Sequence, residues 1–150
     1  MKRKYPDRPI AGVGAVIVRN GDILLVKRGS EPGKGKWSVP GGIVELGETV
    51  EDTVVREVKE ECNLDVEVQG LIDVVDNLIP DEKGNWLYHF IILDYFVEVK
   101  GEYNPVAGSD ILMLKWVSLE EAKKMELTRV FREFLDRNWE ILQQPDLLEE

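Results

Sequence analysis

Residues 49–62 constrain the fold more than any other segment, because their pattern is that of one amphipathic helix with strand-like segments on both sides. Four apolar residues recur every four positions and predict its buried stripe: Val50, Val54, Val58 and Cys62. Thr49 is suited to be the N-cap, with Asp52 in the capping-box position three residues later. Asn63 follows where helices often end in a left-handed residue. We expect this helix to cover one face of a sheet.

The rest of the chain reads mostly as strands. Residues 11–19 and 22–28 predict a hairpin, because the Asn20-Gly21 pair between them tolerates positive φ angles. Further strands are expected at 37–40, 64–79 (with a break at Gly70), 86–99 and 111–117, and helices at 118–125 and 128–144. This order indicates an α/β (α+β) fold in which helices cover a mixed sheet. With no linker or internal repeat, we expect a single domain over residues 1–150.

Composition excludes several classes of protein. The formal net charge is −10 and the pI about 4.7, which disfavours a general nucleic-acid binder, since that function needs clustered Lys and Arg. The basic first residues have no apolar segment behind them, and no apolar run is long enough to span a membrane. The single cysteine, Cys62, fits a reducing compartment. The expectation is a cytoplasmic protein with no nucleic-acid or membrane partner.

Three acidic residues of the predicted helix fall on one arc, at positions i, i+3 and i+4: Glu57, Glu60 and Glu61. The arc lies beside the apolar stripe, so the carboxylates would repel one another unless a cation neutralised them. Mg²⁺ suits such a set, because it is a hard ion that prefers oxygen ligands. A solvated charged face is the alternative, and Lys59 agrees with it. Helix geometry leaves both open.

The residues before the helix add a longer pattern. Gly42 is followed after five residues by Glu48, after seven more by Arg56-Glu57, and then by Val58-x-Glu60-Glu61-x-Asn63-Leu64. This resembles the Nudix box, in which only the last glycine is replaced, here by Asn63. The resemblance implies a Nudix-like α/β/α sandwich with a mixed central sheet. It also implies a hydrolase that cleaves the pyrophosphate of a nucleoside diphosphate linked to another moiety.

The same resemblance implies roles for individual residues. Glu57 and Glu61 would be the main ligands of Mg²⁺ or Mn²⁺, with Glu60 a further ligand or the group that deprotonates the attacking water. The Gly41 region would add a backbone carbonyl to the metal. The catalytic set would also include Arg56 and Glu48, as an ion pair that holds the preceding loop against the helix. Bound divalent ions would neutralise the diphosphate and generate hydroxide near neutral pH.

Members of the family often use a further Glu shortly before a strand that ends in Lys-Trp or Arg-Trp. The position expected for it holds Met113 here, which departs from the pattern. Asp110 and Glu102, in the preceding loop, could replace it, although both also suit a solvated loop. If neither serves, the base must come from the box itself, with Glu60 as the candidate.

Substrate-binding candidates lie outside the box. Arg28 and Lys36 flank a Gly/Pro/Lys loop and could contact phosphates, but ordinary surface charge explains them equally well. Pro80, 16 residues beyond Leu64, matches a proline that marks relatives resembling ADP-ribose pyrophosphatases, although Pro also suits the turn found there. Three aromatic residues could stack on a base or simply pack in the core: Trp37, Trp86 and Tyr88.

The expected substrate is therefore ADP-ribose or a related nucleotide sugar. The alternative is a mutator-type nucleoside triphosphate pyrophosphohydrolase that removes oxidised nucleotides. A third hypothesis is a non-catalytic domain that binds a nucleotide as a signal, which the complete acidic set argues against. A small nucleotide is the expected partner, and a homodimer stays open.

Overall fold

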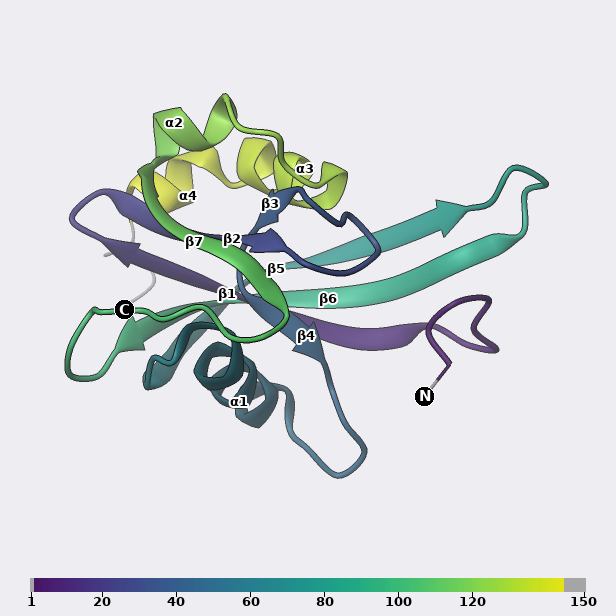
Figure 1. Cartoon of the computed structure of the whole chain (residues 1–150), viewed down its shortest axis with the longest axis horizontal. Helices are drawn as coiled ribbons and strands as arrows, with labels where there is room; N and C mark the ends of the chain where they lie inside the picture. The colour runs from purple at the N-terminus through teal and green to yellow at the C-terminus, as the bar shows by residue number, and fades with distance from the viewer. Residues whose placement is uncertain (1, 145–150) are drawn as a thin grey trace.

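The computed structural model describes residues 2–144, which form a mixed β-sheet with helices on both faces (Figure 1). The strands are β1 (Ile10–Arg19), β2 (Asp22–Arg28), β3 (Trp37–Ser38), β4 (Gly41–Ile43), β5 (Val66–Pro80), β6 (Trp86–Val99) and β7 (Ile111–Ser118). The helices are α1 (Val50–Cys62), α2 (Leu119–Lys123), α3 (Arg129–Arg137) and α4 (Trp139–Gln143). The predicted fold class, a mixed sheet covered by helices, is confirmed.

Strand β1 connects the two parts of the sheet. Residues 10–17 pair in parallel with 90–97 of β6, and β5 extends that side as the antiparallel partner of β6. The end of β1 pairs with β2, which in turn pairs with β3 and β7. Asn20 and Gly21 have φ angles of 50° and 84°, which confirms the predicted hairpin turn.

The two faces of β1 belong to two separate cores, since successive side chains point to opposite faces. Val13, Ala15 and Ile17 pack on the side of α1, against the buried stripe Val54, Val58 and Cys62. Val16 lies on the other side, in a core that includes Phe131 and Phe134 of α3. Val50, predicted to be part of the stripe, is only partly buried.

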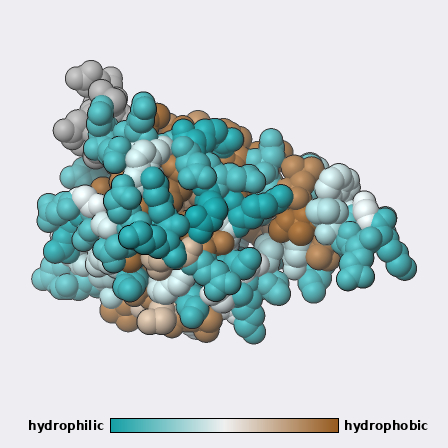
Figure 2. All heavy atoms as spheres, turned by 90° about the horizontal axis from the view of Figure 1, so that it is seen from above, coloured by the Kyte–Doolittle hydropathy of each residue, from teal (hydrophilic) through white to brown (hydrophobic). Residues whose placement is uncertain are grey.

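The β5–β6 hairpin is the longest element of the sheet and projects beyond the helices (Figure 1). Figure 2 shows that its tip is hydrophilic and that hydrophobic side chains reach the surface where the hairpin joins the broader body. Within residues 2–144, no helix is long and apolar enough to cross a membrane.

The helix predicted over residues 128–144 is wrong in extent, because it divides at Asn138 into α3 and α4. The Asn138 side chain is buried, and its amide donates to the Phe134 carbonyl (3.0 Å) and to Asp73 of β5 (2.8 Å). A side chain that bonds to the preceding turn and to the sheet supports such a break. The helix predicted over 118–125 is the shorter α2, capped by Ser118 and Glu121.

Two strand predictions also need correction. The strand expected over 37–40 ends at Ser38, and Gly41–Ile43 form a separate strand, β4, antiparallel to β1. A Cβ on Gly41 would lie 2.1 Å from the Val13 carbonyl oxygen, so only glycine allows that approach. The expected break at Gly70 is also wrong, because β5 continues through it with a register shift.

Candidate active site

A cleft of about 600 Å³ runs between α1, β4 and the start of α3. Its lining includes most of the residues predicted for a site: Arg28, Lys36, Gly41, Arg56, Glu57, Glu60, Glu61, Pro80 and Asp110. Glu48 is not part of the lining. Residues that are far apart in the sequence are therefore brought to one concave surface, the usual form of a small-molecule site.

Both ends of α1 are fixed by local contacts. The Thr49 hydroxyl accepts from the Asp52 amide at 3.0 Å, and Asn63 has the left-handed angles φ 55° and ψ 38° expected of it. The loop 101–110 then crosses the end of the helix, where Val106 and Gly108 donate backbone N–H groups to the carbonyls of Cys62 and Glu61, both at 2.9 Å. These bonds satisfy carbonyls that a helix end leaves without partners.

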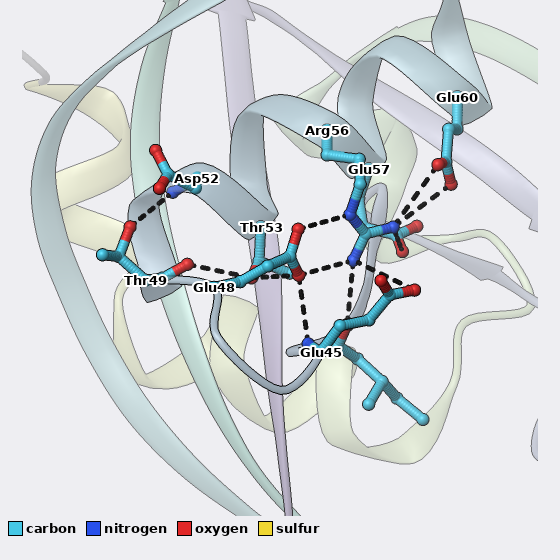
Figure 3. Close-up of polar contacts among 9 residues, drawn as sticks. Glu45, Glu48, Thr49, Asp52, Thr53, Arg56, Glu57 and Glu60 are labelled. Carbon is cyan, nitrogen blue, oxygen red and sulfur yellow. Dashed lines mark hydrogen bonds and ion pairs between the residues drawn. The ribbon is translucent and has the colours of Figure 1, made fainter. Parts of the chain in front are cut away.

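Arg56, which also lines the cleft, is the centre of a polar network that joins α1 to the loop before it (Figure 3). Its Nε and Nη2 donate to the two oxygens of Glu48, at 2.6 and 2.9 Å. Nη1 donates to Glu57 at 2.8 Å and lies 3.3 Å from Glu60. These bonds raise the pKa of Arg56, and the guanidinium, with help from the Glu45 amide, lowers the pKa of Glu48 to about 2.

Glu48 ties the loop 44–49 to the helix. It accepts from Arg56, from the Glu45 amide at 3.0 Å and from the Thr53 hydroxyl at 3.0 Å, and Arg56 also donates to the Ile43 carbonyl at 3.1 Å. The ion pair that the resemblance implies is therefore present, with Arg56 in the lining of the cleft and Glu48 outside it.

Glu61 and Glu57 are the most buried carboxylates on the α1 wall. Burial raises the pKa of Glu61 to about 7, opposed by the Gly41 N–H that donates to it at 2.7 Å, and the charges of Glu57 and Asp110 raise it further. Burial also raises the pKa of Glu57, and Arg56 opposes this shift. The Glu57 carboxylate fills the space beside Gly42, where a Cβ would lie 2.2 Å from its Cδ.

The carboxylates of Glu57, Glu60 and Glu61 are chemically suited to bind a divalent cation. In this structure, however, they do not converge on one point. Across residues 2–144, no three acidic, His or Cys side chains are grouped closely enough to hold an ion. Glu57 and Glu60 are turned towards Arg56, and Glu61 towards Gly41. Two half-buried carboxylates with raised pKa values are nevertheless oxygen ligands that an added positive charge would stabilise.

The structure separates the two candidates for the missing Glu. Asp110 lines the cleft, its charge acts on Glu61, and its carbonyl accepts from the Gly29 amide at 3.1 Å. Glu102 begins the same loop and is not part of the lining. Met113 is also outside the lining and half exposed on β7. Asp110 is thus the only one of the three at the cleft.

Arg28 lines the cleft from the end of β2. Its Nε donates to the Pro32 carbonyl at 2.7 Å, and burial lowers its pKa, opposed by the charge of Glu61. The three aromatic residues considered for stacking do not line the cleft. Trp37 packs in the core beside α3, Tyr88 is buried against Ile10 and Phe90, and Trp86 is half exposed.

Sequence reasoning missed several polar residues of the lining, among them Arg3, Asn77 and Asp94. Asp94, in the middle of β6, is 4% exposed, and burial raises its pKa to about 7. It pairs with Gly14 of β1, where a Cβ would lie 2.0 Å from its Oδ1. In the sequence, the signal for this residue was an aspartate within an otherwise apolar strand.

The mixed sheet between helices, with the glycines of β4 against the acidic helix α1, is the fold of solved Nudix hydrolases. The family model described as NUDIX domain matches residues 8–137, so the chain belongs to the Nudix family. Nudix proteins generally depend on a divalent metal.

Individual relatives agree with this family. The chain is 38% identical over 117 residues to an ADP-ribose pyrophosphatase of Methanocaldococcus jannaschii. This match covers 78% of this chain and 66% of that protein. It is 33% identical over 124 residues to the NAD-capped RNA hydrolase NudC of Pseudomonas aeruginosa. That match covers 81% of this chain and 41% of the relative. The crystal structure of a MutT NUDIX hydrolase from Burkholderia pseudomallei matches with a TM-score of 0.75 and 35% identity over 87% of this chain and 98% of that one. The chain thus spans less than two thirds of the length of the two curated relatives.

Proposed function

We propose that this protein is a metal-dependent pyrophosphohydrolase of nucleoside diphosphates linked to another moiety, with ADP-ribose or a related nucleotide sugar as substrate. The observation that carries the proposal is the half-buried pair Glu57 and Glu61 at a cleft that Arg28 and Lys36 also line. A volume of about 600 Å³ is also of the size that small-molecule sites have.

In this proposal, Glu57 and Glu61 would hold Mg²⁺ or Mn²⁺ with the Gly41 backbone beside them, and Glu60 would be either a further ligand or the base. A divalent ion bound there would lower the pKa of a bound water towards neutral and polarise the phosphoryl oxygens. Glu48 and Arg56 keep the loop 44–49 against α1, so that β4 and the acids stay in register. Arg28 and Lys36 bind the phosphates, which a protein with a net charge of −10 would otherwise repel.

Asp110 or Glu60 takes the proton from the attacking water. Asp110 is favoured by its place on the wall beside Glu61, and Glu60 by its place at the open edge of α1, where its side chain is 58% exposed. Asp110→Asn and Glu60→Gln separate the two, because removal of the true base lowers kcat and flattens the acidic limb of the pH profile. The other variant keeps that limb.

Two observations favour ADP-ribose as the substrate. The M. jannaschii relative bears the name ADP-ribose pyrophosphatase, and Pro80 lies at the cleft rather than in a remote turn. The alternative of a mutator-type nucleoside triphosphate pyrophosphohydrolase is favoured by the likeness to the B. pseudomallei MutT structure. A cytoplasmic location and a homodimer stay predictions.

A product assay with Mg²⁺ tests the proposal on a panel of ADP-ribose, nucleotide sugars, dinucleoside polyphosphates and deoxynucleoside triphosphates. Release of AMP from ADP-ribose, without pyrophosphate from the triphosphates, is the expected result. Pyrophosphate from triphosphates alone would favour the mutator-type activity. Nucleotide binding without turnover by folded protein would favour the non-catalytic domain.

A further inference from the structure

The N-terminal residues 2–7 precede the region matched by the family model, yet they reach the cleft. Figure 1 shows this segment, in purple, folded back beside the start of β1 and the first residues of β6. Arg3 is part of the cleft lining, whereas its neighbours Lys2 and Lys4 are not. Of these three adjacent basic residues, the fold therefore places only Arg3 at the cleft.

Tyr5 holds the segment in place through two hydrogen bonds. Its backbone N–H donates to the Leu87 carbonyl of β6, and its hydroxyl donates to Asp81 Oδ2, each at 2.9 Å. Asp81 is itself fixed, because its Oδ1 accepts the backbone N–H groups of Lys83 and Asn85. Tyr5 has a φ of 49°, a left-handed conformation uncommon for such a residue. The hairpin tip thus serves as a rigid support for the segment.

The charge of Arg3 acts on both walls of the cleft. It opposes the rise in the pKa of Glu57, and it contributes to the lowered pKa of Arg28. Within residues 2–144, no carboxylate lies within ion-pair distance of Arg3, so its guanidinium has no partner of its own. Two guanidinium groups that line one cleft, of which Arg3 has no ion-pair partner among the described residues, are suited to bind an anion together.

We propose that residues 2–7 form a substrate-binding element, in which Tyr5 is the positioning residue and Arg3 contacts the phosphate groups of the substrate opposite the acidic wall. This inference rests on the proposed function, since it names a further residue for the same substrate. Arg suits the role because its planar fork binds phosphate oxygens through two parallel hydrogen bonds. The metal site would hold one side of the diphosphate and Arg3 with Arg28 the other.

Steady-state kinetics of Arg3→Ala, with Lys4→Ala as the matched control, test the inference. Both changes remove one positive charge from the same segment, but only Arg3 lines the cleft. We expect Arg3→Ala to raise KM about tenfold or more, as loss of a charge-assisted hydrogen bond does, with kcat little changed. Lys4→Ala should change KM less than about twofold. An equal rise in KM for the two variants would overturn the inference.

Tyr5→Phe tests the positioning role, because it removes only the hydroxyl that bonds to Asp81. We expect it to raise KM in the native background but to have no further effect in the Arg3→Ala background. Arg3→Lys should fall between the native protein and Arg3→Ala, since it keeps the charge and loses the fork. An undiminished effect of Tyr5→Phe in the Arg3→Ala background would show that Tyr5 acts independently of Arg3 and would contradict the proposal.

Direct binding separates this inference from the proposed function. Titration calorimetry with inorganic pyrophosphate and Mg²⁺ measures anion binding whether or not any panel substrate is hydrolysed. Weaker binding by Arg3→Ala, with native binding by Lys4→Ala, would support the inference even if the panel assay failed. Native turnover and native binding by Arg3→Ala would defeat the inference and leave the proposed function intact. No binding of pyrophosphate by the native protein would defeat the inference, and the panel assay would still decide the proposed function.

Discussion

At the scale of single residues, two carboxylates one helical turn apart have different partners. Glu57 accepts from Arg56 at 2.8 Å and packs on Gly42, whereas Glu61 accepts from the Gly41 N–H at 2.7 Å. Both have raised pKa values because they are withdrawn from water. A side chain that is costly to keep charged in the free protein is better stabilised when a cation joins it.

We expect Glu57→Gln and Glu61→Gln each to lower metal-dependent turnover by at least about 100-fold, since even loss of an outer-shell partner of a metal costs roughly 10–100-fold. Far-UV circular dichroism should be unchanged. Glu51→Gln is the matched control, because Glu51 lies on the exposed side of α1 and outside the cleft lining. Near-native turnover by either cleft variant would refute the metal assignment.

Asp94 should make the protein less stable as pH rises. Its pKa is about 7 in the folded protein against a reference value of 3.8, because burial disfavours the carboxylate and Asp73 repels it, while Arg137 opposes the shift. The free energy of unfolding therefore falls as pH rises from about 4 to about 7. The loss is complete above that range, with an upper limit of about 4 kcal/mol.

Asp94→Asn removes the charge and keeps the shape of the side chain. We expect it to raise the free energy of unfolding, measured with urea, at pH 8 but to change it little at pH 4. Equal effects at the two pH values would mean that folding does not raise the pKa of Asp94. Asp76→Asn, an exposed Asp of β5, is the control.

At the scale of elements, Glu48 joins the loop 44–49 to α1 through Arg56. The lowered pKa of Glu48, about 2, means that its ionised form is favoured by folding. Its contribution to stability is therefore complete above about pH 4.5 and is lost as pH falls towards 2.

Glu48→Gln should consequently lower Tm at pH 7, and the difference from the native protein should shrink when both are measured at pH 3. Glu45→Gln is the control, because Glu45 lies 3.9 Å from Arg56 and its side chain is 68% exposed. A Tm difference independent of pH would contradict the ion-pair explanation.

The sequence predicts an element well when residues within that element determine its bounds. It predicts poorly when the bounds depend on contacts with residues far away in the chain. The α1 boundaries were predictable, since Thr49 and Asn63 act through their own turns. The division of the last helix at Asn138 was not, because half of its cause is Asp73, 65 residues away in β5. Strand β4 was missed for a similar reason, since its glycines are extended only because β1 lies against them.

The candidate site follows the same rule. Helix spacing placed Glu57, Glu60 and Glu61 on one arc but left their role open, whereas the metal-site hypothesis and the Arg56–Glu48 pair came from the resemblance to the Nudix box. The places of Asp110 and Arg3 depend on how a loop and the N-terminal segment fold onto distant elements, through bonds such as those of Gly108 to α1 and Tyr5 to β6. Periodicity carries no information on such contacts.

At the scale of the whole molecule, a net charge of −10 and a half-buried acidic pair should make stability sensitive to divalent ions. We expect Mg²⁺ at about a hundred times its Kd to stabilise the fold by about 2.7 kcal/mol. For a domain of this length, that is a rise in Tm of roughly 5–10 °C.

The control is NaCl at equal ionic strength, which screens surface charge without binding the site. The double variant Glu57→Gln/Glu61→Gln should keep the response to NaCl and lose the additional response to Mg²⁺. Scanning calorimetry with EDTA reversal measures both. An equal rise in Tm with the two salts would show that the ion only screens charge.

The contact between Gly14 and Asp94 also limits which sequences this fold can accept. The carboxylate of Asp94 occupies the space that any larger side chain at position 14 would need. Gly14→Ala alone should therefore be poorly tolerated, and Gly14→Ala with Asp94→Gly much better. Among relatives that share this sheet, the two positions should covary, so that a side chain on β1 goes with a small residue on β6.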